Sequence, residues 1–460
     1  MVVAGTHSGA GKTTVATGLL AALRAAGHRP AAAKVGPDFI DPGYHALACG
    51  RPPRNLDAWL CGLDAIAPLA ARAAAGADLL VIEGVMGLFD GAADGTPSST
   101  ADVARALGAP VVLVVDAAAQ SSSVAAVVHG FATLDPTVRI GGVVLNRVAS
   151  DGHEVLLREA LAPVGVPVLG ALRRDDRLVW RDRHLGLVPV AERPDQVAAS
   201  LAALAAAVAD RVDLAAVVAL ATSAPPLAAG PVALPRPAPA PAPAPQRPPR
   251  PSIRVAVAGG RAFTFTYTDT LEALAAAGAE VVVFDPLRDP RLPPDIDGLL
   301  VGGGFPETYA AELADNRPLL ADVRRRVSGG GLPTWAECGG LTWLCRQLDG
   351  HPMAGVVDAA ATMGDRLHLG YRTARTAAET PLGPAGTELR GHEFHYSTVD
   401  PPGAALDLRS RFASHPDGHA TPTLLATYLH HHPGGDPSMV ANFVAACGRK
   451  PLRGRERVSG

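Results

Sequence analysis

The apolar residues of this chain gather in short continuous runs, separated by longer stretches rich in Ala, Leu and Arg. Continuous apolar runs are typical of strands buried on both faces of a parallel sheet, and the stretches between them are typical of helices. The regular alternation predicts the α/β class, with two doubly wound parallel-sheet domains. The predicted strands include residues 79–83, 111–116, 142–146, 253–258, 280–285 and 298–301.

One segment interrupts this alternation. Residues 225–251 are dominated by Pro and Ala in alternation, which excludes a helix and favours an extended polyproline conformation. We interpret the segment as a semi-rigid spacer between domains. The predicted domains are therefore residues 1–224 and 252–446, and residues 447–460 form a C-terminal tail.

Composition narrows the class of protein. Hydrophobic residues make up 48% of the chain but aromatic residues only 4%, so Ala, Val and Leu must build the core. A net charge of -3 gives no reason to expect a nucleic-acid or membrane partner. The N-terminus lacks a signal or membrane-length apolar segment, and the five cysteines are scattered and odd in number. These features predict a cytoplasmic protein in a reducing compartment.

The first motif is glycine-rich. Residues 5–14 read GTHSGAGKTT and lie between an apolar run and a predicted helix over residues 15–26. This is the context of a P-loop, in which Lys12 neutralises the β- and γ-phosphates of a nucleotide and Thr13 binds Mg²⁺. The spacing departs by one residue from the strict G-x-x-x-x-G-K-T pattern, and a glycine-rich turn without a ligand is the alternative.

Charged residues follow three further predicted strands. Lys34, Asp38 and Asp41 lie among turn-forming residues, and turn chemistry alone could explain the two aspartates. Lys34 falls at the carboxyl end of a strand, where open α/β sheets bind ligands. Asp57 has a comparable position, and Glu83 ends a buried apolar run, where a carboxylate is costly unless it is paired or bound to metal. Glu83 is therefore a candidate Mg²⁺ ligand, and a surface glutamate is the alternative.

Two more polar groups lie in the same half. Asn146 closes a predicted strand and could contact the edge of a nucleotide base. Further on lies a basic cluster, which fits equally well a solvated surface or a site for a polyanionic substrate. Its members are Arg173, Arg174, Arg177, Arg181, Arg183 and His184.

The second half carries a candidate nucleophile. Cys338 lies between a predicted strand and a predicted helix, which is typical of an exposed nucleophile on a turn whose helix N-terminus lowers the thiol pKa. The glycines of 302–304 are a candidate source of oxyanion-binding N–H groups. Residues 430–432 are three histidines, one of which could deprotonate the thiol. A buried structural cysteine is the alternative.

The motifs together resemble one family, the cobyrinic acid a,c-diamide synthases of corrinoid biosynthesis, including the hydrogenobyrinic acid form. The resemblance covers nearly the whole chain apart from the spacer. The stretches that carry it are AGTHSGAGKTTVATGLL, KVGPDFIDPGYH, EGVMGLFDG, GVVLNRV, RHLGLVP, GGGFPE, AECGGLTWL, GHEFHYS and TYLHHH. It implies a P-loop amide ligase fused to a triad-type glutamine amidotransferase, which uses ATP and Mg²⁺ to convert carboxylates of a tetrapyrrole to amides.

The same resemblance assigns roles to individual residues. Cys338 would release ammonia from glutamine with His430 as its base, and Lys34 and Asp38 would lie where the carboxylate is activated. The groups implied to hold nucleotide are Gly9, Gly11, Lys12, Thr13, Thr14 and Asn146. The implied Mg²⁺ ligands are Thr13, Asp57 and Glu83.

The resemblance leaves several points open. Typical triads carry a Glu two residues after the His, but that position is His432 here, so either His430 or His432 could face the thiol. Rival interpretations are a cobyric acid synthase, a nickel-sirohydrochlorin amidase, a P-loop switch with an inert amidotransferase domain, and a glutaminase with a regulatory ATPase half. The cobalt content of the substrate is also open, with a weak preference for the metal-free acid. The expected partners are the tetrapyrrole, glutamine and ATP, with a homodimer as a candidate assembly.

Overall fold

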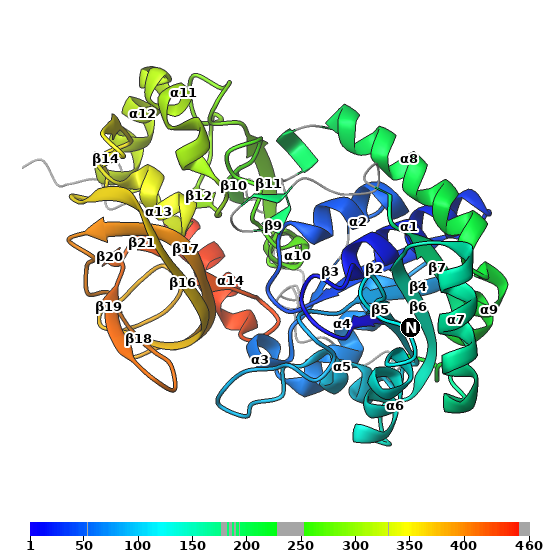
Figure 1. The fold of residues 1–460 in the computed structure, drawn as a ribbon. Helices are drawn as coiled ribbons and strands as arrows, with labels where there is room; N and C mark the ends of the chain where they lie inside the picture. Colours follow the sequence, from blue (N-terminus) through cyan, green and yellow to red (C-terminus); the bar gives the residue numbers. More distant parts are fainter. Residues whose placement is uncertain are drawn as a thin grey trace, which may run out of the picture. The chain divides into compact units, whose positions relative to one another are not determined.

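A computed structural model describes residues 1–52, 54–175, 194–227, 253–329 and 331–449, together with the short pieces 182–183, 186–187 and 190–192. The chain divides into two compact units, Met1–Val232 and Ala233–Gly460 (Figure 1). Each unit is described by itself. Most of the predicted spacer and tail lie outside the described residues.

Unit 1 is built on a seven-stranded parallel sheet in the order β3-β2-β4-β1-β5-β6-β7. The chain leaves β1 toward one edge of the sheet and leaves β4 toward the other, so the β1–β4 pair is the switch point at which such sheets bind ligands. The strands are β1 (Val2–Gly5), β2 (Pro30–Val35), β3 (Arg54–Leu56), β4 (Leu79–Glu83), β5 (Val111–Asp116), β6 (Ile140–Val148) and β7 (Val168–Arg173).

Helices cover both faces of this sheet. Figure 1 shows α1, α2 and α8 on one side of the strands and α4, α5 and α6 on the other. The helices are α1 (Lys12–Ala25), α2 (Asp41–Cys49), α3 (Ala58–Cys61), α4 (Ile66–Ala74), α5 (Thr100–Leu107), α6 (Val124–Leu134), α7 (Asp151–Leu161), α8 (Pro194–Arg211) and α9 (Leu214–Thr222). Short elements are η1 (Leu63–Ala65), η2 (Ala162–Val164), η4 (Val190–Glu192) and the β8 (Asp182–Arg183)–β9 (Gly186–Leu187) pair.

The core of unit 1 consists of small apolar side chains, as the composition predicts. Every residue of β2 is buried, although three of its six residues are alanines. Small side chains let the helices approach closely, so few aromatic residues are needed to fill the core. The helix α1 packs so tightly on α8 that a Cβ on Gly18 would lie 2.6 Å from a Val208 methyl group.

Unit 2 contains a second parallel sheet, in the order β11-β10-β12-β13-β21-β20, with only β20 antiparallel to its neighbour. Its strands are β10 (Ile253–Ala258), β11 (Ala279–Phe284), β12 (Gly298–Val301), β13 (Thr334–Glu337), β20 (His419–Thr421) and β21 (Leu424–Thr427). The helical elements are α10 (Thr268–Ala276), η5 (Pro306–Tyr309), α11 (Ala310–Asp315), α12 (Arg317–Arg324), η6 (Arg325–Gly329), α13 (Gly339–Leu344) and α14 (Pro437–Cys447).

Unit 2 also contains a mainly antiparallel sheet that the sequence pattern did not predict. Its path is β15-β14-β16-β17-β22, and β18 and β19 extend it from β16. The strands are β14 (Gln347–Leu348), β15 (His351–Pro352), β16 (Ala360–Thr376), β17 (Glu388–Asp400), β18 (Leu406–Arg409), β19 (Ser414–Asp417) and β22 (His430–His431). The α/β class and the parallel sheets are confirmed, and the antiparallel sheet is an addition to them.

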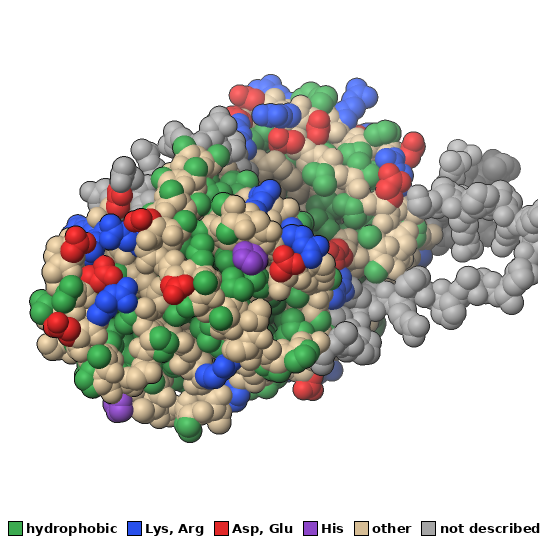
Figure 2. Space-filling model, turned by 90° about the vertical axis from the view of Figure 1, so that its right-hand side faces the viewer, with side chains coloured by type: hydrophobic (Ala, Val, Ile, Leu, Met, Phe, Trp, Pro, Cys, Tyr) green, Lys and Arg blue, Asp and Glu red, His purple; other side chains and the backbone are tan. Residues whose placement is uncertain are grey.

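The surface carries charges of both signs. On the face that Figure 2 shows, the described Lys and Arg side chains lie interspersed with Asp and Glu among apolar and uncharged groups. No helix in the described part of the chain is long and apolar enough to span a bilayer.

Candidate active sites

The glycine-rich loop joins β1 to α1 at the switch point of unit 1. Gly9 and Gly11 have φ values of 82° and 99°, a backbone region that favours glycine. The helix begins at Lys12, three residues earlier than predicted, so Lys12, Thr13 and Thr14 form its first turn. The free N–H groups of a first turn attract anions, and this loop therefore has the geometry of a phosphate site.

The ammonium group of Lys12 folds back onto the backbone of this loop. It donates a hydrogen bond to the carbonyl of His7 at 3.2 Å, and the side chain is 8% exposed. Burial, and after it the neighbouring Lys34 ammonium, lower the pKa of Lys12 to about 8. An anionic ligand in the loop would reverse that shift and favour the charged amine.

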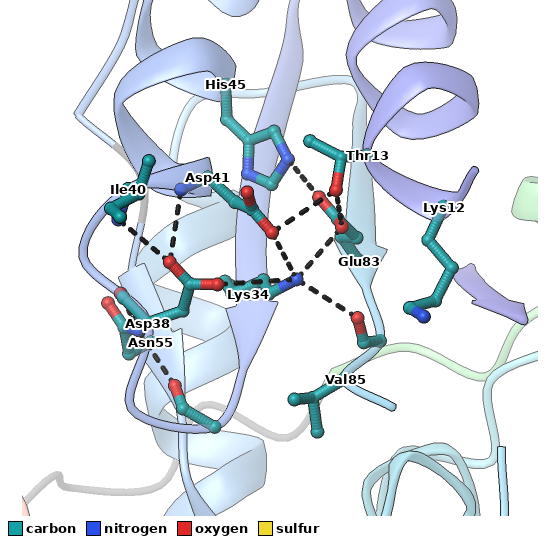
Figure 3. Close-up of polar contacts among 12 residues, drawn as sticks. Lys12, Thr13, Lys34, Asp38, Ile40, Asp41, His45, Asn55, Glu83 and Val85 are labelled. Carbon is teal, nitrogen blue, oxygen red and sulfur yellow. Dashed lines mark hydrogen bonds and ion pairs between the residues drawn. The ribbon is translucent and has the colours of Figure 1, made fainter. Parts of the chain in front are cut away.

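Side chains from β2, α2 and β4 converge on Thr13 (Figure 3). The Lys34 ammonium donates to Asp41 Oδ2 at 2.7 Å, to Glu83 Oε1 at 2.9 Å and to the Gly84 carbonyl at 3.1 Å. The Thr13 hydroxyl lies 2.6 Å from Glu83 Oε1 and 3.2 Å from Asp41 Oδ2. One hydroxyl, two carboxylates and an ammonium thus share a single buried site.

The charges in this cluster depend on one another. Burial acts against the ammonium of Lys34, but Asp41, Glu83 and Asp38 hold the pKa of Lys34 above its ordinary value. Burial also acts against the carboxylate of Glu83, yet Lys34 and His45 hold the pKa of Glu83 well below its ordinary value. Burial and the nearby Asp38 raise the pKa of Asp41. Three carboxylates around one lysine leave the cluster short of positive charge.

This donor set fits Mg²⁺. The oxygens of Thr13, Asp41 and Glu83 lie within hydrogen-bonding reach of one another or of a shared ammonium, and hard oxygen ligands are those that Mg²⁺ prefers. Among the described residues no group of three or more His, Cys, Asp or Glu forms a metal site on its own. Mg²⁺ usually takes one or two carboxylates and completes its shell with water and phosphate, so this sparse set suits a nucleotide-bound metal.

Two predicted site residues have local partners. The Asp38 carboxylate accepts the backbone N–H groups of Ile40 and Asp41 and lies 3.8 Å from the Lys34 ammonium. Asp38 thus forms a turn and lies near Lys34, and its predicted place at the activated carboxylate stays a prediction. Asp57, predicted as a metal ligand, caps α3 by accepting the N–H of Leu60.

Asn146 contacts the P-loop in this structure. Its amide nitrogen donates to the Ala10 carbonyl at 3.0 Å, and a Cβ on Gly11 would lie 2.0 Å from the same nitrogen. Its amide oxygen accepts the N–H of Arg147. These bonds use one N–H and one oxygen lone pair of the amide, which has two of each, so Asn146 can also contact a nucleotide base.

The candidate nucleophile of unit 2 lies on a strained turn. Cys338 joins β13 to α13 with φ 49° and ψ -103°, a region that costs a residue with a side chain about 1–3 kcal/mol. The glycines that follow it let α13 press against the loop after β12. A Cβ on Gly340 would lie 2.2 Å from the Val301 carbonyl, and one on Gly339 would lie 3.1 Å from the Gly304 nitrogen. The predicted strand–turn–helix elbow is present, and α13 contacts the 302–304 loop.

The environment of the thiol differs from the prediction. Cys338 is 6% exposed, and burial, followed by the charge of Glu307, raises its pKa above the ordinary value. The expectation that a helix N-terminus lowers this pKa is therefore wrong, because the six-residue α13 is outweighed by burial and by a nearby carboxylate. Because its pKa is raised, catalysis at Cys338 would require a base.

The three histidines of residues 430–432 are all buried but have different neighbours. A Cβ on Gly303 would lie 2.5 Å from the His430 ring, which places that ring against the glycine loop beside the elbow. His431 Nδ1 bonds to Glu337 at 2.7 Å. The ring of His432 lies beside Tyr267, with 4.6 Å between centroids, and 3.8 Å from the carboxylate of Asp269.

Comparison with known proteins covers both units. Residues 1–187 match the family described as the CobQ/CobB/MinD/ParA nucleotide binding domain, and residues 254–437 match the CobB/CobQ-like glutamine amidotransferase domain. The hydrogenobyrinate a,c-diamide synthase of Streptomyces coelicolor is 52% identical, with 97% of each chain covered. The chain belongs to the a,c-diamide synthase family.

Other members of the a,c-diamide synthase family support the assignment. The hydrogenobyrinate enzyme of Thermobifida fusca is 50% identical, with 97% of this chain and 96% of the relative covered. The cobyrinate enzyme of a Synechococcus species is 39% identical, with 97% and 98% covered. As a member of this family the chain is a glutamine amidotransferase ligase, which the amidotransferase domain match also indicates.

The structure adds residues to which the sequence analysis gave no role. Asp41 contacts both Thr13 and Lys34, and His45 Nε2 lies 2.6 Å from Glu83 Oε2. The spacing offered a clue, because residues four apart share a face once α2 begins at Asp41. In the predicted basic cluster, Arg173 forms ion pairs with Asp151 and Glu154, and its Nη2 lies 2.9 Å from Glu154 Oε2. Arg177, Arg181 and His184 lie outside the described residues.

Proposed function

We propose that this protein catalyses the ATP-dependent amidation of the a and c carboxylates of hydrogenobyrinate, using ammonia that it releases from glutamine. The observation that carries the proposal is that one chain contains two sites: a cation–carboxylate site next to a P-loop, and a cysteine elbow whose neighbouring glycine loop contacts an imidazole. The same chain aligns with a named a,c-diamide synthase over 97% of its length. Neither site alone could make an amide from an unactivated acid and glutamine.

In unit 1 the P-loop would bind ATP, with Gly9, Gly11, Lys12, Thr13 and Thr14 around its phosphates. A substrate carboxylate oxygen attacks the γ-phosphorus, the bond to ADP breaks, and an acyl phosphate forms. Ammonia then attacks the acyl carbon, phosphate leaves, and the amide nitrogen gives up a proton. Lys12 and Lys34 supply the positive charge that this step needs, because negative charge moves onto the leaving phosphate oxygens.

Mg²⁺ would be held by Thr13 and Glu83, with Asp41 as a third ligand that the structure favours by its contacts. When bound, it would supply neutralisation of phosphate charge. Asp57 would join this site through Oδ2, because Oδ1 accepts the N–H of Leu60. Asn146 would contact adenine while still donating to Ala10, because an amide NH₂ carries two hydrogens.

In unit 2 Cys338 would be the nucleophile and His430 its base. The neutral thiol gives its proton to His430 as sulfur bonds to the glutamine carboxamide carbon, and N–H groups of the 302–304 loop and the elbow can bind the oxyanion. The proton passes to the departing nitrogen, ammonia leaves, and water hydrolyses the thioester. The position of the His430 ring against Gly303 supports His430 over His432 for this role.

The metal-free acid is the favoured substrate on identity. Relatives named for hydrogenobyrinate are 48–52% identical to this chain, whereas those named for cobyrinate are 39–42% identical. We also propose a cytoplasmic location, since all five cysteines are free thiols, as expected in a reducing compartment. A homodimer stays a prediction.

The test is mass spectrometry after incubation with ATP, Mg²⁺, glutamine and either acid. We expect the wild-type protein to add two amides, and Cys338→Ala to add two amides from ammonium salts but none from glutamine. Cys345→Ala is the matched control, because Cys345 is also a buried free cysteine but has no proposed role in the reaction. This variant should keep both activities. Four amides would indicate a cobyric acid synthase, and equal loss with both nitrogen donors would refute the separation of the two sites.

A further inference from the structure

The amidotransferase site lacks a carboxylate where the sequence pattern of triads would place one. The residue two positions after His430 is His432, so no acidic group follows the proposed base in β22. A histidine base needs a partner on its second ring nitrogen, which fixes the tautomer and stabilises the imidazolium that forms. The question is which group in the described part of unit 2 can supply that partner.

Glu337 is the carboxylate that meets this requirement. It is the last residue of β13, directly before the nucleophile, and is 6% exposed. Its Oε1 atom accepts three hydrogen bonds, from the Trp335 indole at 2.9 Å, the His431 backbone N–H at 3.1 Å and His431 Nδ1 at 2.7 Å. Three donors on one oxygen fix the carboxylate plane and leave Oε2 for another partner.

That partner is His430. Its Nδ1 atom lies 3.6 Å from Glu337 Oε2, within ion-pair distance. The Cε1–Nε2 edge of the ring faces the glycine loop, since a Cβ on Gly303 would lie 2.5 Å from Cε1 and 3.2 Å from Nε2. The ring is 1% exposed, so water cannot readily replace either contact.

We propose that Glu337 is the positioning residue of the glutaminase reaction and takes the place of the missing triad carboxylate. The inference rests on the proposed roles of Cys338 and His430. With its proton on Nδ1, His430 faces Glu337 Oε2 at ion-pair distance, and a lone pair is left on Nε2 for the thiol proton. When that proton transfers, the imidazolium lies against the Glu337 carboxylate. Burial acts against the ionised form of Glu337, but His430 and His431 lower its pKa to about 2.

The neighbouring acids are less suited to this role. Asp269 lies beside His432, whose ring packs on Tyr267. Asp417 accepts hydrogen bonds from the Thr427 hydroxyl and the Tyr428 N–H. The other charged or titratable groups that act on the pair and the thiol are His431, His392, which lies opposite His430 on β17, and Glu307 in η5.

The test is Glu337→Gln, which preserves shape. The three donors around Oε1 would select the amide oxygen at that position, so the amide NH₂ would face His430 Nδ1. A donor there forces the proton onto Nε2, which is the wrong tautomer for a base. We expect kcat for glutamine hydrolysis to fall by about 10²- to 10⁴-fold, with KM for glutamine within about twofold of wild type and with ammonium-dependent amidation retained.

Asp417→Asn is the matched control, because it makes the same change at another buried carboxylate near the thiol, and it should lower kcat less than tenfold. A wild-type kcat in Glu337→Gln would overturn the inference. Equal loss of glutamine- and ammonium-dependent amidation would also overturn it, by showing a structural role alone. If Cys338→Ala still hydrolysed glutamine, the proposed function itself would fail, whatever Glu337→Gln does.

Discussion

In both sites, one buried charged residue contacts side chains from several segments and fixes their positions. Lys34 pairs with carboxylates from α2 and β4 in unit 1, and Glu337 contacts two histidines from β22 in unit 2. Removing one partner of such a group leaves the other buried without compensation, which costs about 3–5 kcal/mol. Substitutions at these residues must therefore preserve shape if function is to be separated from folding.

Asp417 offers a test at this scale. Burial raises the pKa of Asp417 to about 6, so the folded protein keeps a proton that the unfolded chain loses near pH 4. Stability then falls as pH rises through this window. The stability of Asp417→Asn does not change with pH for this reason. The free energy of unfolding of the variant, relative to that of the wild type, should therefore rise by about 1.4 kcal/mol between pH 5 and pH 8.

Urea unfolding of both proteins at the two pH values measures this difference. Asn can still accept both hydrogen bonds of Asp417 through its amide oxygen, so the comparison isolates the charge. Parallel pH profiles for the two proteins would contradict the pKa shift.

At the level of elements, the elbow depends on the close approach of α13 to β12. Gly340→Ala would place a Cβ 2.2 Å from the Val301 carbonyl, and main-chain atoms cannot yield as a flexible side chain can. We expect a loss of about 1–3 kcal/mol in stability and of most glutaminase activity, because Cys338 shifts with the helix. The measurements are the thermal midpoint and kcat for glutamine hydrolysis.

Gly329→Ala is the control for that substitution. A Cβ at Gly329 meets no atom within 4 Å, and its φ is not in the left-handed region. A change of similar size in both variants would show that glycine content, and not the contact with β12, sets the stability.

Elements differ in how far the sequence predicted them. The strands at 79–83, 111–116, 253–258 and 298–301 match the structure, because each is an apolar run buried on both faces. The antiparallel sheet was missed because β16 (Ala360–Thr376) is largely exposed and carries polar residues without a clean alternation. A motif indicates the local geometry at Lys12 and Cys338, each at the start of a helix that follows a strand, whereas the contacts of Asp41 and Glu337 join segments far apart in the sequence.

The whole molecule joins two sites with separate requirements, one for nucleotide and one for thiol. Unit 1 holds every proposed phosphate and metal group, and unit 2 holds the Cys338 thiol, its proposed base and Glu337. The two activities should therefore be separable by substitution within a single chain.

Lys12→Ala tests this at the scale of the chain. Without its ammonium the P-loop loses neutralisation of phosphate charge, so amidation should fall at least 10²-fold with glutamine and with ammonium alike. Basal glutamine hydrolysis should stay within about threefold of wild type, the reverse of Cys338→Ala. Amide formation by mass spectrometry and glutamate release measure the two. Normal ammonium-driven amidation in Lys12→Ala would refute the P-loop assignment.

The depth of Cys338 has a consequence for the life of the enzyme in the cell. Peroxides oxidise thiolates far faster than thiols, and exposed low-pKa cysteines are the first to be lost. The Cys338 thiol is 6% exposed, and burial raises its pKa, so it offers such oxidants little access and little thiolate. The burial of this thiol therefore favours a cysteine that is oxidised slowly by peroxide.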